Sequence, residues 1–263
     1  MSSLINFIGT SAHTLPRCLS IASVLITQSL SVLNGAEVVT RSDHLKFGGY
    51  PGEPGFIKLF NGKDLTGWDG QPGSWTVEAG VIQCTGKADA RNWLIWRGFG
   101  AADFELRLDF RFRKGNSGVQ VRSSDLGDWQ VRGYQVEVSP PEGMGLWHHS
   151  LMSPDIEIQN TRKHLATAGQ RVTIAEDGQK EVEQFEKAKT IQSHYKEGEW
   201  NTMRVIVQGN RLIQIINGLV FSDVIDDQAG FSSDTGVIAF QDHGKGADVA
   251  FRNIRIKILN PAE

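Results

Sequence analysis

Three short stretches of the sequence hold the side chains best suited to proton transfer. Glu137 lies in the apolar run GYQVEV, His148 follows Trp147 in the glycine-rich stretch GMGLWHHS, and His243 lies in FQDHGKG. Imidazole and carboxyl groups transfer protons near neutral pH, and an indole can stack on the face of a sugar ring. The three stretches therefore predict an acid–base site or a sugar-binding site. The alternative interpretation is solvated histidines on surface turns and a packed tryptophan.

A second group of polar side chains surrounds the turn Gly-Asn-Ser-Gly at 115–118. Successive residues of a strand point to opposite faces, and the period-two pattern on both sides of this turn predicts two strands. Guanidinium, carboxamide and carboxylate groups together donate and accept hydrogen bonds in fixed directions, as sugar hydroxyls require. A solvated sheet face with cross-strand ion pairs would give the same pattern. With the strand GYQVEV added, we expect one sheet face to present Arg111, Arg113, Gln120, Arg122, Gln135 and Glu137.

Several common functional classes find no support in the sequence. The stretch GNSGV resembles the nucleophile elbow G-x-S-x-G, but Val119 takes the last position and no strand–turn–helix pattern follows. The turn EDGQ lacks the spacing of a calcium loop, and no phosphate-binding or dinucleotide-binding motif occurs. The net charge of −3 gives no reason to expect nucleic acid as a partner. Cys84 has apolar neighbours, which predict a buried, inert thiol.

The elements that must position these groups are short β-strands. From residue 54 onward, about a dozen apolar runs alternate with turn signals. Asn217-Gly218 between two such runs is the strongest hairpin signal. Partial helical spacing is confined to 154–169 and 181–198. The pattern predicts an all-β sandwich of two antiparallel sheets with short helical insertions, in which the concave outer face of one sheet can hold an extended ligand.

The N-terminal 36 residues predict a targeting segment. Residues 1–17 contain one arginine and no acid, and a Ser- and Thr-diluted apolar run follows up to Ala36. The run is too short and too polar for a membrane span, and it favours an export signal removed after Ala36. An uncleaved anchor is the alternative. We therefore expect export to the periplasm or the medium, a linker at 37–53 and one domain at 54–260.

Five segments resemble one known family in their sequence and their order. Across residues 54–259 they resemble the 3-keto-disaccharide hydrolase domain family, which is common in secreted bacterial proteins. The resemblance implies a concanavalin A-like jelly roll, which agrees with the sandwich predicted from the strands, and cleavage of 3-keto-glycosides. The segments are GFIKLFNGKDLTGW, DFELRLDFRFRKGNSGVQVRS, GYQVEV, GEWNTMRVIVQGNRLIQIING and GVIAFQDHGKGADVAFRNIRIKIL.

The resemblance also implies which residues form the site. The family's Gly-Asn-Ser-Gly turn, its Tyr-Gln strand and its Gln-x-His-x-Gly segment match residues 115–118, 134–137 and 241–244. Many members have a tyrosine and an acid where this chain has Trp147-His148-His149, which leaves the identity of the catalytic acid open. The candidate acids and bases are Glu137, His243 and His148. The candidate substrate-binding side chains are Asn116, Arg111, Arg122, Gln135, Trp147 and Gln241.

The implied chemistry starts from a sugar already oxidised at C3, supplied by an upstream sugar 3-dehydrogenase. A base removes the acidified hydrogen at C2, the enolate expels the oxygen at C1, and water addition completes a net hydrolysis. The route needs a base, an acid and a positive group near the C3 oxygen, such as Arg111 or Arg122. It requires no cofactor, although Glu137 and His243 could together hold a divalent metal. A non-catalytic carbohydrate-binding module is the main alternative; an ordinary glucanase is the weaker one, because QVEV lacks three alternating acids.

Overall fold

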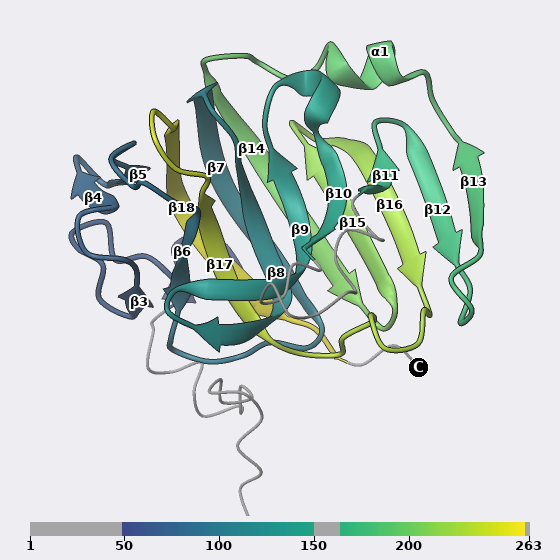
Figure 1. The fold of residues 1–263 in the computed structure, drawn as a ribbon, viewed down its shortest axis with the longest axis horizontal. Coiled ribbons are helices and arrows are strands. Elements are labelled where there is room, and N and C mark those ends of the chain that lie inside the picture. Colours follow the sequence, from purple (N-terminus) through teal and green to yellow (C-terminus); the bar gives the residue numbers. More distant parts are fainter. Residues whose placement is uncertain (1–48, 150–163, 261–263) are drawn as a thin grey trace, which may run out of the picture. The chain divides into compact units, whose positions relative to one another are not determined.

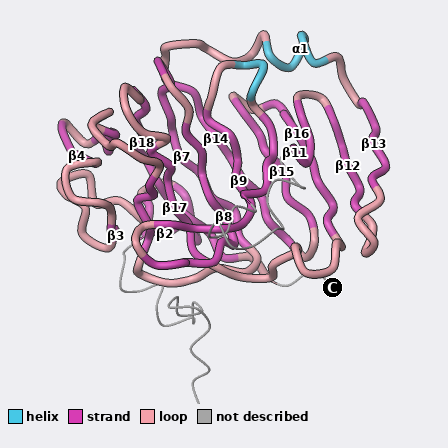
Figure 2. The backbone as a smooth tube through the Cα atoms, in the orientation of Figure 1, coloured by secondary structure: helices cyan, strands magenta, loops and turns pink. Residues whose placement is uncertain are grey.

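The computed structural model describes residues 49–149 and 164–260, which form two facing β-sheets (Figure 1). Strands make up most of the traced backbone, and helix is confined to short segments (Figure 2). This arrangement confirms the predicted all-β sandwich. The single α-helix of the described part is α1 (Ala188–Gln192), and a 3₁₀ turn covers Pro141–Gly143.

The larger sheet has 11 strands in the order β1-β2-β18-β7-β14-β15-β16-β12-β13, with β5 paired to β18 and β4 to β5. Within the described residues, β12 and β16 run parallel, and the other paired strands are antiparallel. The strands are β1 (Gly49–Tyr50), β2 (Glu53–Lys58), β4 (Trp75–Glu78), β5 (Val81–Cys84), β7 (Phe104–Lys114), β12 (Gln170–Ile174), β13 (Lys180–Gln184), β14 (Trp200–Gln208), β15 (Arg211–Ile216), β16 (Leu219–Asp226) and β18 (Asp248–Ile258).

The smaller sheet has seven strands in the order β11-β10-β9-β8-β17-β6-β3. Its inner face packs on the larger sheet, and its outer face carries most of the predicted site. The strands are β3 (Trp68–Asp69), β6 (Asn92–Trp96), β8 (Ser117–Gly127), β9 (Gln130–Val138), β10 (Gly145–His149), β11 (His164–Thr167) and β17 (Val237–Asp242).

The hydrophobic core lies between the two sheets. Alternate residues of β7, from Phe104 to Phe112, point into it and are buried. Phe240 of β17 stacks on Phe251 of β18 with ring centroids 4.2 Å apart, and it also stacks on Trp68 at 4.9 Å. Because β17 and β18 belong to different sheets, these aromatic contacts hold the two layers together.

The chain crosses from one sheet to the other between β7 and β8. Only Gly115 and Asn116 separate the two strands, yet β7 pairs with β14 and β18, whereas β8 pairs with β9 and β17. The expectation that Arg111 and Arg113 share a face with Gln120 and the β9 residues is therefore wrong. The short connection forms a corner of the sandwich instead of a hairpin within one sheet.

The arginines of β7 belong to the outer face of the larger sheet. Arg107 donates to Glu105 at 2.6 Å and to Glu53 at 2.8 Å. The guanidinium carbon of Arg111 lies 4.9 Å from the ring centroid of Trp200, its cross-strand neighbour on β14. For this strand the alternative interpretation is correct: the arginines form cross-strand ion pairs and cation–π contacts on a sheet surface.

Other local predictions have mixed outcomes. The Asn217-Gly218 hairpin is confirmed, because both residues adopt left-handed conformations, with φ of 49° and 86°, between β15 and β16. The two predicted helical insertions are mostly not helical where they are described. Residues 164–167 form the strand β11, and 181–198 contain most of the strand β13 and the short helix α1. The earlier part of the first insertion lies outside the described residues.

The predicted export signal at 1–36 and most of the predicted linker also lie outside the described residues. The end of that linker differs from expectation, because Gly49–Tyr50 already form β1 and Glu53 begins β2. Among the described residues, no helix has the length and apolar character needed to cross a membrane.

Candidate functional site

A row of buried polar side chains crosses the outer face of the seven-stranded sheet. This polar row consists of Gln120 on β8, Gln135 and Glu137 on β9, and Gln241 on β17. Gln120 Nε2 donates to Gln135 Oε1 at 2.7 Å. Gln135 Nε2 in turn donates to Glu137 Oε1 at 2.6 Å and to Gln241 Oε1 at 3.2 Å. The structure thus brings together Gln135, Glu137 and Gln241, three of the predicted site residues.

The Gly-Asn-Ser-Gly turn and the start of β8 support this row. A Cβ on Gly118 would lie 2.4 Å from Cγ and Cδ of Gln135, so the absence of a side chain lets Gln135 cross the strand. Ser117 Oγ donates to the backbone oxygen of Gln241 at 2.6 Å and ties β8 to β17. Asn116 lies in the corner itself, and its buried side-chain oxygen has no hydrogen-bond partner in the described part of the chain. Its role in sugar binding stays a prediction.

Tryptophans flank the polar row at both ends. Trp147 on β10 lies directly opposite Gln135, and Trp93 on β6 lies opposite Gln241. Since paired residues of neighbouring strands share a face, both indoles lie on the same side of the sheet as the row; Trp93 is buried, at 2% exposed, and Trp147 is half-buried. Beside it, an apolar cluster separate from the main core contains Trp93, Ile95, Val131, Val237 and Ala239. Indole and carboxamide groups on one surface suit a sugar ring, which has apolar faces and polar edges.

Burial controls the ionisation of Glu137. Its side chain is only 5% exposed, and the loss of hydration raises its pKa to about 8, although the hydrogen bond from Gln135 acts in the opposite direction. At neutral pH this carboxyl group is therefore mainly protonated. A carboxyl group in that state can donate a proton, and it becomes a base when the pH rises.

His243 follows β17 two residues after Gln241, near the Trp93 end of the row. The residue is exposed, yet partial burial of its imidazole lowers its pKa, and the positive charge of Arg91 lowers it further. The imidazole is therefore neutral at physiological pH. His243 and Glu137 have pKa values displaced in opposite directions, which separates a proton acceptor from a proton donor.

Arg91 is a site candidate that sequence reasoning missed. Its guanidinium carbon lies 5.9 Å from the ring centroid of Trp93, and its charge acts on His243. Arg91 is half-buried and forms no ion pair with residues of the described ranges, 49–149 and 164–260. The segment ADARNW contains no motif that could have revealed it.

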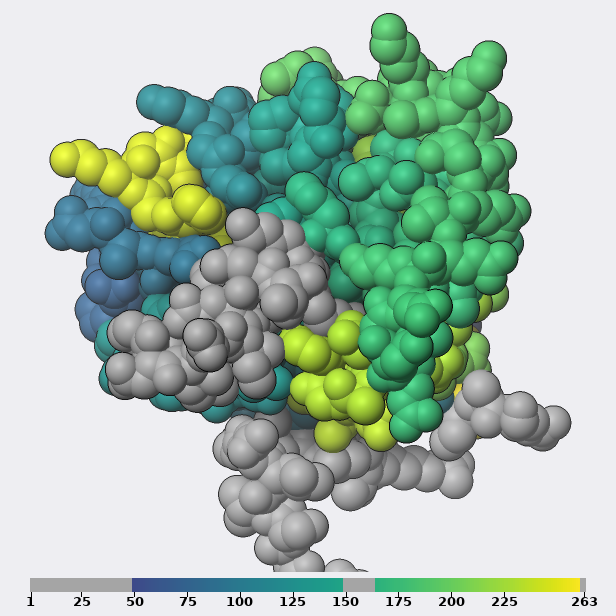
Figure 3. Space-filling model, turned by 45° about the vertical axis from the view of Figure 1, so that its right-hand side comes forward, coloured from purple at the N-terminus to yellow at the C-terminus, as the bar shows by residue number. Residues whose placement is uncertain are grey.

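Asp242 was also missed, and it supports the turn that carries His243. Its side chain is fully buried, burial raises its pKa, and Oδ1 accepts a hydrogen bond from the backbone of Gly244 at 3.0 Å. Yellow atoms near the C-terminal end of the chain lie at the surface beside blue atoms of its early part in Figure 3. Within the connection between β17 and β18, Gly246 donates its backbone N–H to the oxygen of Gly86 at 2.8 Å. Both contacts fix the backbone on either side of the exposed imidazole.

Arg122 does not face the polar row, contrary to expectation. It lies at an irregularity of β8 in a left-handed conformation, with φ of 45°, and is only 3% exposed. Its guanidinium donates to the backbone oxygens of Ala102 at 2.8 Å and Gly209 at 2.6 Å, and to Asp103 Oδ1 at 2.6 Å. Arg122 therefore holds separate chain segments together and is not placed to bind a sugar on the row.

His148 also departs from the predicted site. It belongs to β10 and lies opposite Tyr134, whose side chain joins the core. The buried imidazole meets the rings of Tyr134 and Phe231 edge-on, with centroids 5.2 Å and 5.9 Å away. It thus points to the face opposite Trp147. Of the three candidate acids and bases, Glu137 belongs to the polar row, and His243 follows the strand that carries Gln241.

Comparison with known proteins gives three similarities. The model of the 3-keto-alpha-glucoside-1,2-lyase-like domain matches residues 55–257. A 3-keto-disaccharide hydrolase of Bacteroides thetaiotaomicron is 25% identical over 240 residues, which cover 78% of this chain and 79% of that protein. Among solved structures, a glycosyl hydrolase-like protein of Parabacteroides distasonis ATCC 8503 shares the fold, with a TM-score of 0.51 and 19% identity over 78% of this chain and 99% of that chain.

Proposed function

Since the chain belongs to the 3-keto-alpha-glucoside-1,2-lyase-like domain family, we propose that it cleaves 3-keto-glycosides by elimination followed by hydration. The similarity to a 3-keto-disaccharide hydrolase supports a hydrolase at the level of the family. The observation that carries the finer proposal is the opposite displacement of two pKa values on one surface: that of Glu137 is raised to about 8, and that of His243 is lowered.

His243 and Glu137, whose pKa values are displaced, supply the two proton transfers. Neutral His243 takes the hydrogen from C2 of the 3-keto sugar, and the electron pair of that C–H bond forms an enolate with the C3 oxygen. When the enolate collapses, the C3 ketone is restored, a C1–C2 double bond forms and the C1–O bond breaks. Protonated Glu137 gives its proton to the departing oxygen. Glu137 then takes a proton from water as the water oxygen adds to C1, and His243 returns its proton to C2, so the overall change is hydrolysis without net oxidation and both groups are restored.

Arg91 is the cation best placed to stabilise the enolate. The sequence favoured Arg111 or Arg122 for this role, but Arg111 lies on the other sheet and Arg122 is held by backbone oxygens and Asp103. Arg91 lies over Trp93 beside His243, and its charge has no carboxylate partner among the described residues. A positive group near the C3 oxygen lowers the barrier to removal of the C2 hydrogen.

The sugar is held by the carboxamides and the indoles. Gln120, Gln135 and Gln241 offer donors and acceptors already oriented by one another, and the half-buried Trp147 offers a flat apolar surface. Such preorganisation reduces the reorganisation needed when a substrate binds. The proposal does not depend on a metal: in the described ranges no three His, Cys, Asp or Glu side chains group as metal ligands, and no step above is assigned to one.

The decisive experiment compares 3-keto-glucosides with the parent glucosides under identical conditions. We expect cleavage of the 3-keto-glucosides alone, because only the ketone acidifies the C2 hydrogen. Deuterium at C2 should slow the reaction or be lost to solvent. Equal rates on oxidised and unoxidised sugars would assign the protein to the ordinary glycosidases.

A non-catalytic carbohydrate-binding role is the second candidate. The mutually bonded carboxamides between two tryptophans favour it, because this surface could hold a sugar without any proton transfer. Binding of both sugars without turnover of either would establish that role. The raised pKa of Glu137 favours the catalytic role over the binding role, since sugar binding alone does not need a buried acid.

A further inference from the structure

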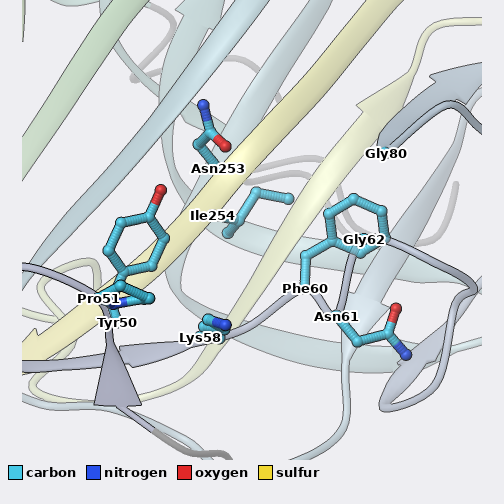
Figure 4. A pocket seen from close by; sticks show the side chains of 9 residues that line it. All are labelled: Tyr50, Pro51, Lys58, Phe60, Asn61, Gly62, Gly80, Asn253 and Ile254. Atoms are coloured by element: carbon cyan, nitrogen blue, oxygen red, sulfur yellow. The ribbon is translucent and has the colours of Figure 1, made fainter.

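A pocket of about 410 Å³ opens on the larger sheet, on a different sheet from the polar row. Its lining comes from β1, β2 and β18, from the turns on either side of β2 and from the turn between β4 and β5 (Figure 4). The volume lies in the range of small-molecule sites, which is roughly 300–1,000 Å³. No residue of the polar row lines it, so it is a separate site. The side chains used below are Tyr50, Lys58, Phe60, Asn253 and Ile254.

The floor of this pocket is apolar and its wall is an aromatic ring held in place. Phe60 and Ile254 are 7% and 1% exposed, and the rings of Tyr50 and Phe60 lie on either side of Ile254 (Figure 4). The guanidinium carbon of Arg255 lies 4.4 Å from the centroid of the Tyr50 ring, and Arg255 is itself bound to Glu53 at 2.7 Å. Because Arg255 occupies one face of this ring, the other face is left as a rigid stacking surface.

Asn253 adds a fixed hydrogen-bond acceptor to the pocket. Its backbone is left-handed, with φ of 55°, at an irregularity of β18. Its Nδ2 donates to Asp109 Oδ2 at 2.7 Å, and its backbone oxygen accepts from Arg255 at 2.8 Å. These bonds fix the orientation of the amide and leave its Oδ1 to accept a hydrogen bond from a ligand hydroxyl.

Lys58 gives the pocket a positive charge. It is the only charged side chain among the lining residues, and it forms no ion pair with residues 49–149 or 164–260. The carboxylate of Glu53, at the start of the same strand, is bound by Arg107 and Arg255 at 2.8 Å and 2.7 Å. An ammonium group with no ion pair among the described residues gives this pocket a positive charge that favours an anionic ligand.

We propose that this pocket binds a pyranose unit that carries a carboxylate, as in a uronic acid. Tyr50 stacks on the C–H face of the ring, Asn253 accepts from a hydroxyl, and Lys58 pairs with the carboxylate. The proposal is independent of the proposed catalytic function, since it uses residues of the other sheet. It would give the protein a second contact with acidic sugar chains.

Calorimetric titration with methyl β-glucuronide tests the proposal, with methyl β-glucoside and acetate as matched ligands. We expect the glucuronide to bind more tightly than either control, since the glucoside lacks the charge and acetate lacks the ring. Tyr50→Ala and Lys58→Gln should each weaken glucuronide binding by about tenfold, which corresponds to about 1.4 kcal/mol. Lys189→Gln, on the distant α1, should leave the affinity unchanged.

Three results would overturn the proposal that this pocket binds a uronic acid. Absence of glucuronide binding would remove the site, and equal affinity for acetate would reduce it to an ion contact. Unchanged affinity in both pocket variants would place the ligand elsewhere. Tyr50→Phe keeps the ring and should retain binding, which separates loss of the stacking surface from misfolding of the variant. Cleavage of 3-keto-glucosides should be the same in Tyr50→Ala as in the unmodified protein.

Discussion

The side chain of Gln135 crosses over Gly118 so closely that any β-carbon there would displace it. Gly118→Ala should therefore push Gln135 away from Glu137 and break the 2.6 Å hydrogen bond between them. Because that bond lowers the pKa of Glu137, we expect the alkaline limb of the pH–rate profile to move to higher pH. Steady-state kinetics across the pH range measures the shift. Gly49→Ala is the control, since a Cβ there meets nothing closer than 4.0 Å; an unmoved limb in Gly118→Ala would contradict the coupling.

Glu137→Gln preserves the shape of the side chain and removes its exchangeable proton. If Glu137 protonates the leaving oxygen, turnover of 3-keto-glucosides should fall by about 10²–10⁴-fold. Single-turnover kinetics with purified variants gives the comparison. Glu183→Gln changes an exposed carboxylate of β13 bound to Arg171 and should leave turnover intact. Full activity in Glu137→Gln would remove Glu137 from the reaction.

The rate of cleavage should follow a bell-shaped pH profile. It should fall below the lowered pKa of His243, where the imidazole is protonated, and above about 8, where Glu137 loses its proton. His243→Asn should lower turnover by about 10²–10⁴-fold and abolish the acid limb. A profile that keeps its acid limb in His243→Asn would assign that limb to another group.

The raised pKa of Glu137 also makes stability depend on pH. Between its ordinary pKa of 4.5 and about 8, the folded protein holds a proton that the unfolded chain has released. Stability should therefore fall as pH rises through this window, by at most about 1.4 kcal/mol per pH unit from this group. Glu137→Gln should flatten the dependence, because the amide does not titrate. Urea unfolding at several pH values tests this, and parallel curves for both proteins would disprove the assignment.

Arg122→Met should destabilise the protein strongly. The change removes the guanidinium that donates to Asp103 and to the backbone oxygens of Ala102 and Gly209. Removing one partner from a buried ion pair costs about 3–5 kcal/mol, whereas Arg107→Met on the outer sheet face should cost about 1 kcal/mol or less. Chemical denaturation of both variants measures the difference. Equal losses would mean that Arg122 is no more important to the fold than a surface arginine.

The sequence predicted those parts of the site that depend on strand alternation alone. Gln135 and Glu137 differ in parity from the core residues Tyr134 and Val136, so their common face follows once the strand is recognised. Gln241 was identified through the family pattern. If residues 145–149 had been recognised as a strand, the same rule would have placed Trp147 and His148 on opposite faces.

The remaining errors come from features that alternation does not encode. A connection of two residues usually joins neighbours in one sheet, but at Gly115–Asn116 the chain turns a corner, and Arg111 goes to the other layer. The left-handed conformation of Arg122 breaks the parity of β8 at that residue. Arg91 reaches the site only through tertiary packing on Trp93, for which the local sequence holds no signal.

One series of hydrogen bonds in the polar row runs toward Glu137, while Gln135 also donates to Gln241. Ser123 donates to Gln120, Gln120 to Gln135, and Gln135 to Glu137, so every donor along the series is oriented toward the carboxyl group. Successive bonds in such a series polarise one another. Loss of the Glu137 proton should therefore alter the electron density at the Gln120 amide, two hydrogen bonds away. The side-chain NH₂ resonances of Gln120 thus become a spectroscopic reporter for the charge of a residue that they do not touch.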